Sequence, residues 1–177
     1  MNAIVFRDAV AADLPAIVAI YNSTIAGRQV TADLDPVGVQ SRVAWFDAHD
    51  AVRRPLWVAE RGTDIVGWLS FSDFYGRPAY GASVEVSIYL AESMRGQGLG
   101  RTFLERAIVE APRFGVKTLL GFIFGHNEPS LRLFERYGFE RWGTLPRVAS
   151  LDGVERDLII VGLRLGERTT PAAVAKG

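Results

Sequence analysis

Apolar residues in the first part of the chain change from strand-like to helix-like spacing and back. A short apolar run comes first, and apolar residues three and four positions apart follow Asp13 and Pro15, which are typical of a helix start. A second stretch with helical spacing precedes two strand-like runs, which a polar spacer of hairpin composition joins. The predicted elements are a strand at residues 4–7, a helix ending near Gly27, a loop at 31–36, a helix at 37–49, and strands at 56–59 and 65–71.

The segment from Ser83 to Leu90 alternates strictly between two kinds of side chain. This period of two predicts a strand with one face in a core. The core face carries Val84, Val86, Ile88 and Leu90, and the other face carries Glu85, Ser87 and Tyr89.

The second half of the chain repeats the change between helical and strand patterns. Its apolar spacing predicts a helix at residues 99–111, a central buried strand at 118–124, a helix at 130–137 ended by Gly138, and strands at 139–146 and 156–165 joined at Asp152-Gly153. The order is strand, two helices, three strands, helix, strand, helix, two strands. This order predicts a mixed α/β (α+β) layer architecture rather than a regular βαβ alternation.

The composition is that of one globular domain. The chain has 177 residues, of which 49% are hydrophobic and 23% charged, so we expect a single domain over residues 1–168 and a flexible tail over 169–177. Twenty basic residues balance twenty acidic ones. This balance gives no electrostatic ground for a nucleic-acid or membrane partner.

The rare residue types narrow the possible chemistry. The chain has no cysteine and two histidines, which excludes disulfides and thiolate sites and makes a metal centre an unfavoured expectation. No apolar run reaches membrane-spanning length, and the first residues lack a signal-peptide pattern, so a cytoplasmic location is the default expectation.

A glycine-rich loop stands between the Ser83–Leu90 strand and the helix that follows. Its glycines allow sharp turns and a close approach of backbone to a ligand, and amide groups at a helix start attract anions. Arginines at both ends add positive charge, so a phosphate is the expected guest. The loop reads Arg95-Gly96-Gln97-Gly98-Leu99-Gly100-Arg101.

Two nucleotide-binding loops do not fit this sequence. A P-loop needs a lysine before the Ser or Thr at the helix start, whereas the chain has Gly100-Arg101-Thr102. A dinucleotide-binding loop needs a third glycine at position 101 and an acidic residue about twenty positions later, and both are missing. A glycine turn without a ligand remains an alternative from the loop alone.

Four segments, taken together and in order, carry a family pattern. They are Ile20–Asn22 with Thr31, Ala32 and Pro36; Arg77–Tyr80 with Ser83–Leu90; Arg95–Gly100; and His126–Leu131 with Phe134–Phe139. The chain resembles the GNAT superfamily over nearly its full length, and more closely its phosphinothricin and methionine sulfone (sulfoximine) N-acetyltransferases. The glycine loop matches the coenzyme A loop of that superfamily, Arg/Gln-x-x-Gly-x-Gly/Ala.

The resemblance implies a fold and a co-substrate. The fold is a twisted mixed sheet of about seven strands flanked by about four helices, whose central strands splay apart to admit the pantetheine arm of acetyl-CoA. The backbone of Ile88, Tyr89 and Leu90 is then expected to bond the pantetheine amides, and Asn127 and Ser130 to lie along it. Phe134 belongs to the same expected coenzyme site, at a position where many members carry a tyrosine acid. Tyr137 is displaced by almost one helical turn, so that acid role is not transferred to it.

Glu85 is the candidate general base. A protonated amine is not a nucleophile, so an acetyltransferase must remove a proton before or during attack on the thioester. Burial in the middle of a strand would raise the pKa of Glu85, and the resemblance assigns the base to a glutamate at this position. A solvated carboxylate paired with an arginine is the alternative.

The acceptor site is the least determined part of the sequence. In the resembled subfamily the acceptors are amino acids or their analogues, and Arg77 is the candidate partner of their carboxylate, with a surface arginine as the alternative. Relatives often carry a further arginine where this chain has Tyr75. Phe74, Tyr75 and Tyr80 could instead form an aromatic wall, and Thr31 belongs to a loop expected to close over the acceptor. The four tryptophans, Trp45, Trp57, Trp68 and Trp142, are interpreted as core or interface residues.

The resulting hypothesis is acetyl transfer from acetyl-CoA to the primary amine of a small amino-acid-like substrate by direct attack. The subfamily resemblance adds a homodimer as an expectation. Two alternatives remain from sequence: a protein N-terminal or lysine acetyltransferase, and an acyl-CoA-binding sensor without catalysis.

Overall fold

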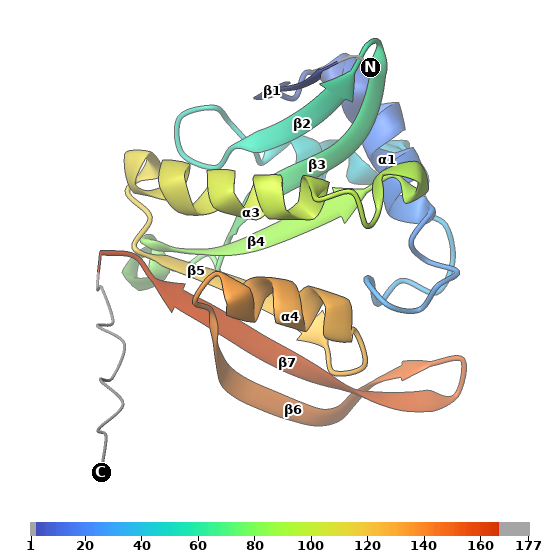
Figure 1. The fold of residues 1–177 in the computed structure, drawn as a ribbon, viewed down its shortest axis with the longest axis vertical. Coiled ribbons are helices and arrows are strands. Elements are labelled where there is room, and N and C mark those ends of the chain that lie inside the picture. The colour runs from blue at the N-terminus through green and yellow to red at the C-terminus, as the bar shows by residue number, and fades with distance from the viewer. Residues whose placement is uncertain (1–2, 167–177) are drawn as a thin grey trace.

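Seven strands form one mixed sheet in a computed structural model that describes residues 3–166 (Figure 1). Their spatial order is β1-β2-β3-β4-β5-β7-β6, and only β4 and β5 run parallel. The predicted tail at 169–177 lies outside the described residues. The strands are β1 (Ile4–Asp8), β2 (Leu56–Arg61), β3 (Asp64–Asp73), β4 (Ser83–Leu90), β5 (Thr118–Phe124), β6 (Glu140–Leu151) and β7 (Val154–Arg164).

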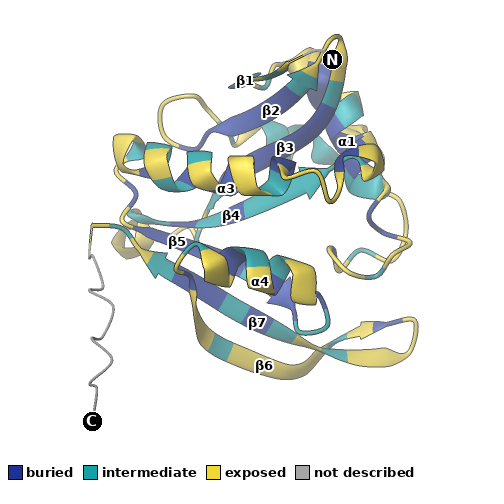
Figure 2. Cartoon of the chain, viewed as in Figure 1, coloured by how far each residue is buried: buried dark blue, intermediate teal, exposed yellow. Residues whose placement is uncertain are grey.

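Helices cover both faces of this sheet. On the face turned to the viewer in Figure 1, α3 (Leu99–Glu110) crosses β3 and β4, and α4 (Glu128–Arg136) lies over β5 and β7. The opposite face carries α1 (Leu14–Asn22) and the short α2 (Val43–Asp47). Figure 2 shows the burial that results: β3 and β5 are largely buried, β4 is mostly half-buried, and the edge strand β6 is mostly exposed.

The alternation along β4 sends its side chains into two different environments, as the sequence predicted. Val84 and Val86 belong to the core beneath α3, where Phe103 is fully buried. Tyr89 packs on the other face, in the cluster that Ile17 of α1 and Trp68 of β3 form. Glu85 and Ser87 therefore point to the α1 side of the sheet.

The two central strands separate after three residues of pairing. Ser83, Val84 and Glu85 of β4 pair with Thr118, Leu119 and Leu120 of β5, and the ladder ends there. The other edge of β4 stays paired with β3 up to Leu90. The expected splay is confirmed, and it leaves one edge of residues 86–90 without a strand partner.

The predicted helix at 37–49 is shorter in the structure. It consists of a 3-10 turn at Gln40–Arg42 followed by α2 at Val43–Asp47. Asn22 explains the late start, because its side chain accepts a hydrogen bond from the amide of Val37 and donates one to the carbonyl of Val37, which replaces helical bonding there.

The last hairpin is longer than predicted. The sequence predicted the sixth strand around residues 139–146. The structure continues β6 to Leu151, with a register shift between Leu145 and Ala149 that takes Pro146 out of regular pairing. Asp152 and Gly153 both have positive φ and form the predicted turn.

Candidate active site

Two cavities meet at the side chain of Glu85. One has a volume of about 1000 Å³ and follows the gap between β4 and β5, and the other has about 250 Å³ and lies between β4 and α1. Glu85, Ser87 and Tyr89 line both. The end of the β4–β5 ladder at Glu85 therefore joins a long groove to a small chamber.

Most of the residues predicted for the coenzyme line the large cavity. They include the unpaired part of β4, the loop before α3, and the first turn of α4. The predicted residues on its wall are Ile88, Tyr89, Leu90, Arg95, Gly96, Gly98, Gly100, Arg101, Asn127, Ser130 and Phe134, together with Thr31 from the predicted acceptor set.

Gln97 and Leu99 are predicted loop residues that do not line the large cavity. The Leu99 side chain is 3% exposed and belongs to the main core, as the apolar stripe of α3 requires. The Gln97 side chain turns back to donate a hydrogen bond to the carbonyl of Ser93. Successive side chains at a helix start point in different directions around the axis. Adjacent loop residues therefore cannot all face one groove.

Gly96 and Gly98 give the loop its shape. Their φ angles are +71° and +84°, and Gly98 is the N-cap residue directly before α3. A Cβ built on either would meet nothing within 4 Å, so the requirement for glycine is conformational rather than steric. The loop thereby presents the N-terminus of α3 to the cavity, where a helix attracts anions.

Asn127 joins the first turn of α4 to residues 28–29 at the large cavity. Its side chain accepts a hydrogen bond from the amide of Ser130 at 3.3 Å and caps α4. Its Nδ2 donates to the carbonyl of Gln29 at 3.0 Å. His126 adds a 2.7 Å bond from Nε2 to the carbonyl of Arg28, so two neighbouring side chains hold residues 28–29 at the wall of the cavity.

Glu85 lies half-buried and without an ion-pair partner among the described residues. Burial raises the pKa of its carboxyl group above the ordinary value, and the 3.4 Å hydrogen bond that Ser87 Oγ donates opposes this in part. The alternative of a solvated glutamate paired with arginine does not describe this side chain. A raised pKa in a cavity is typical of a proton-transfer group.

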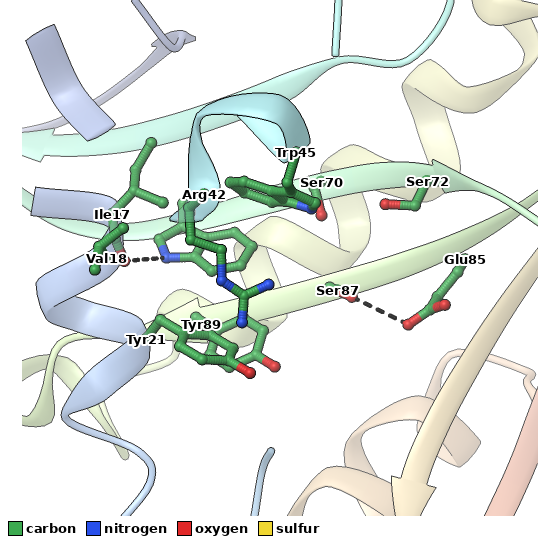
Figure 3. A pocket seen from close by; sticks show the side chains of 11 residues that line it. Ile17, Val18, Tyr21, Arg42, Trp45, Ser70, Ser72, Glu85, Ser87 and Tyr89 are labelled. Atoms are coloured by element: carbon green, nitrogen blue, oxygen red, sulfur yellow. Dashed lines mark hydrogen bonds between the residues drawn. The ribbon is translucent and has the colours of Figure 1, made fainter. Parts of the chain in front are cut away.

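Aromatic rings form the walls of the small cavity (Figure 3). Tyr89 stacks on Trp68 with ring centroids 4.4 Å apart, and Trp45 lies 5.4 Å from Trp68. The ring centroid of Tyr21 lies 5.1 Å from that of Tyr89, and these four rings form an aromatic box. Arg42 extends between these rings, and Ser70, Ser72 and Ser87 also line the cavity, where the Ser87 hydroxyl donates to Glu85.

Sequence reasoning missed most of this chamber. Tyr21, Arg42, Ser70 and Ser72 were not predicted as site residues, and Trp45 and Trp68 were interpreted as core or interface residues. Trp68 is 3% exposed, so that interpretation holds for its burial, yet Trp68 and Trp45 also line the cavity. The strict alternation of β4 was the available signal for Ser87, because it shares a face with Glu85.

The other two tryptophans lie away from the cavities. Trp57 is a core residue at 3% exposure, as predicted. Trp142 is 45% exposed and rests on Gly162, where a Cβ would overlap its ring.

The loop between β3 and β4 carries the other predicted acceptor residues, and it lies outside both cavities. Tyr75, Arg77 and Tyr80 are exposed, and Tyr75 has a φ of +56° at the turn. Phe74 packs against Tyr75 and Tyr80 and stacks on Phe122, which lines the large cavity. The aromatic cluster thus borders the groove through Phe122 alone.

Known acetyltransferases are similar to this chain in sequence and in fold. The model of the acetyltransferase (GNAT) family matches residues 17–139, which include both cavities' central strand and the glycine loop. The chain belongs to the GNAT acetyltransferase family. YwnH of Bacillus subtilis, named provisionally as a phosphinothricin acetyltransferase, is 52% identical over 154 residues, covering 86% of this chain and 94% of that protein.

Two further relatives of this GNAT acetyltransferase are described by their substrate or ligand. The L-methionine sulfoximine/L-methionine sulfone acetyltransferase of Pseudomonas paraeruginosa is 34% identical, covering 90% of this chain and 93% of its own length. A phosphinothricin acetyltransferase from Sinorhizobium meliloti, solved in complex with acetyl-CoA, superimposes with a TM-score of 0.87 at 29% identity over 96% of this chain and 91% of that one. The seven-stranded GNAT fold expected from the sequence is thereby confirmed.

Within residues 3–166, no helix is both long and apolar enough to cross a membrane. The same residues contain no group of three or more side chains arranged to hold a metal ion.

Proposed function

We propose that this GNAT acetyltransferase transfers the acetyl group of acetyl-CoA to the primary amine of a single amino acid or amino-acid analogue. One observation carries the proposal: Glu85 lines both the long groove and the small chamber. A base at the junction can reach an amine held in the chamber while the acetyl donor lies in the groove.

The large cavity offers hydrogen-bond donors and positive charge that suit coenzyme A. Gly96 and Gly98 bring backbone amides and the start of α3 to the cavity, and Arg95 and Arg101 add positive charge for a pyrophosphate. The unpaired edge of residues 86–90 offers backbone groups to the pantetheine amides in the manner of an added strand. Acetyl-CoA supplies the activated acetyl thioester there.

Glu85 is the proposed general base. Its carboxylate accepts the proton of the acceptor ammonium directly or through a water, which leaves a nucleophilic nitrogen for direct attack without a covalent enzyme intermediate. The raised pKa of Glu85 strengthens the carboxylate as a base. The amide of Leu90 is our candidate donor to the thioester oxygen.

The size of the small cavity favours a small acceptor. A volume of about 250 Å³ is below the range of roughly 300–1000 Å³ typical of drug-sized ligands. The aromatic box suits the carbon chain of one amino acid, and the name of the Pseudomonas relative supports methionine sulfone and sulfoximine as test substrates. Thr31 stays a proposed acceptor-site residue, and Phe74, Tyr75, Arg77 and Tyr80, which lie outside both cavities, stay sequence-based predictions for the acceptor.

A homodimer in the cytoplasm completes the proposal. The subfamily resemblance supports the dimer, with the loop that carries Tyr75 and Arg77 near the neighbouring subunit. Sedimentation of the purified protein tests it: a mass of about twice the 19.4 kDa chain supports the dimer, and a single-chain mass contradicts it.

A panel of amines tests the function. We expect release of coenzyme A thiol from acetyl-CoA with methionine sulfone, methionine sulfoximine or phosphinothricin, and much less with polyamines or short peptides. Turnover of peptides alone would favour a protein acetyltransferase. Absence of turnover with every amine, together with tight acetyl-CoA binding, would favour a sensor.

Thermal unfolding tests the coenzyme site separately. A ligand at about 100 times its Kd stabilises the folded state by about 2.7 kcal/mol. For a domain of this size that corresponds to a rise in Tm of about 5–10 °C. No rise with acetyl-CoA at millimolar concentration would contradict the assignment of the large cavity.

A further inference from the structure

The small cavity has one charged group of each sign on its wall, Arg42 and Glu85. An amino acid also carries one charge of each sign. We propose that Arg42 binds the carboxylate of the acceptor while its amine is directed to Glu85, an inference that rests on the proposed amino-acid acetylation. Nothing in the sequence pattern assigned a role to Arg42.

Arg42 is well placed for this role. It is the last residue of the 3-10 turn before α2, and its guanidinium carbon lies 4.6 Å from the centre of the Tyr21 ring. Stacking on an aromatic face fixes the plane of the guanidinium and leaves its edge for anions. Figure 3 shows this edge inside the chamber, on the same side of β4 as Glu85.

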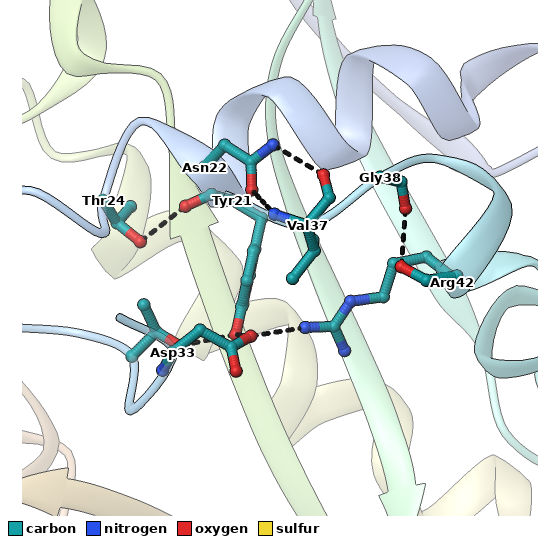
Figure 4. Close-up of polar contacts among 9 residues, drawn as sticks. Tyr21, Asn22, Thr24, Asp33, Val37, Gly38 and Arg42 are labelled. Carbon is teal, nitrogen blue, oxygen red and sulfur yellow. Dashed lines mark hydrogen bonds and ion pairs between the residues drawn. The ribbon is translucent and has the colours of Figure 1, made fainter. Parts of the chain in front are cut away.

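The guanidinium of Arg42 has spare donors. Its Nη2 donates to Asp33 Oδ2 at 2.8 Å, as Figure 4 shows, and no hydrogen bond within the described chain uses its Nε or Nη1. An arginine offers five N–H donors in a planar fork that matches a carboxylate. Arg42 therefore has capacity for a second carboxylate without losing the first.

Asp33 is the ion-pair partner of Arg42 in this structure. The same Asp33 oxygen accepts a hydrogen bond of 2.5 Å from the Tyr21 hydroxyl, so Asp33 joins Tyr21 and Arg42, two residues that line the chamber. The Asp33 side chain is 41% exposed, where solvent weakens its attraction to Arg42. An acceptor carboxylate inside the aromatic box is less screened and competes for Arg42 on favourable terms.

Arg77, the sequence-based candidate for the carboxylate, lacks these features. It is exposed on the loop between β3 and β4 and lines neither cavity. Arg42 lines the chamber that also contains the proposed base. The geometry therefore favours Arg42 over Arg77 for an acceptor bound next to Glu85.

The test compares an acceptor with its carboxamide, which keeps the amine and removes the negative charge. For the wild type we expect kcat/KM to be about 10- to 100-fold higher for methionine sulfone than for its amide. Arg42→Met should reduce this ratio to near one, chiefly through KM for the acid, and Arg42→Lys should keep part of it. Arg113→Met is the matched control, because Arg113 is exposed on the far end of the α3 region and pairs with Glu110.

A second variant keeps the fold of the chamber and changes only how strongly residue 33 competes with the acceptor carboxylate for Arg42. Asp33→Asn retains an oxygen that can accept from Tyr21 but removes the charge next to Arg42. We expect it to lower KM for the acid by a few-fold and to leave KM for the amide unchanged. This variant decides the matter if Arg42→Met does not fold.

The outcomes separate this inference from the proposed function. If the wild type acetylates amino acids but Arg42→Met keeps the preference for acid over amide, the role of Arg42 is wrong and the function stands. An equal loss for acid and amide would make Arg42 a structural residue. If the wild type acetylates no amino acid, the function itself fails.

Discussion

Glu85 and Leu120 form the last pair of the β4–β5 ladder. Beyond this pair the strands diverge, and the groove that opens between them meets the chamber beneath α1 at the Glu85 side chain. The position of one strand pair thus determines both where the groove begins and where the candidate base lies.

Replacement of Gly98 tests the loop before α3. An L-residue at its φ of +84° costs roughly 1–2 kcal/mol, and the loop can relieve this cost by moving. We expect Gly98→Ala to raise KM for acetyl-CoA about tenfold in initial-rate measurements, with a smaller change in kcat. Gly143→Ala is the control, because a Cβ there makes only ordinary contacts; an equal effect of both would remove the special role of the loop.

Ser87 tunes the pKa of Glu85. Its hydroxyl donates to the carboxylate and favours the charged form, which opposes the effect of burial. Removal of this donor in Ser87→Ala should raise the pKa of Glu85 further. The acidic limb of the kcat/KM profile against pH should therefore move to higher pH, and a move to lower pH would contradict this assignment.

Tyr137 should be dispensable for chemistry. Its hydroxyl donates to Glu105 at 2.5 Å on the surface, and it lines neither cavity. We expect Tyr137→Phe to leave kcat and its pH dependence within about twofold of the wild type. A large fall in kcat with unchanged stability would mean that Tyr137 reaches the leaving thiolate after all.

Asp13 links stability to pH at the start of α1. Hydrogen bonds from Arg7 hold the pKa of Asp13 below its ordinary value. A depressed pKa contributes stability above the unfolded-state pKa, and this contribution is lost as the pH falls through the folded-state pKa. In urea unfolding at pH 7, Asp13→Asn should cost about 1–2 kcal/mol, and the difference from wild type should shrink near pH 3.

The control for Asp13 is Asp47→Asn, at an exposed position that ends α2. We expect it to change the free energy of unfolding by less than about 0.5 kcal/mol at either pH. If Asp13→Asn lowered the free energy of unfolding equally at both pH values, the shape of the side chain and not its charge would matter at this site.

Local patterns were enough to predict the strand and the glycine loop that line the large cavity. The alternation of Ser83–Leu90 and the spacing of Gly96 and Gly98 are properties of short segments, and the structure places them as expected. The same local reasoning failed where one residue overrode a pattern: Asn22 delayed the helix expected from residue 37, and a bulge carried β6 past Pro146.

The small cavity depends on packing that no short segment encodes. Tyr21, Arg42, Trp68 and Glu85 come from four elements and meet only when α1 and α2 dock on the sheet. A tryptophan in a strand predicts burial, and Trp68 is buried, but burial does not reveal that its ring also faces a cavity. The exposed position of Arg77 likewise follows from the turn at Tyr75, whose positive φ the residue type does not predict.

The rate of acetyl transfer by Glu85→Gln tests the central claim most directly. Glutamine keeps the shape of the side chain and cannot accept the proton. We predict that kcat for an amino-acid acceptor falls at least about 10²-fold while the rise in Tm with acetyl-CoA stays as in the wild type. Turnover at the wild-type rate in Glu85→Gln, with the same product, would contradict the account.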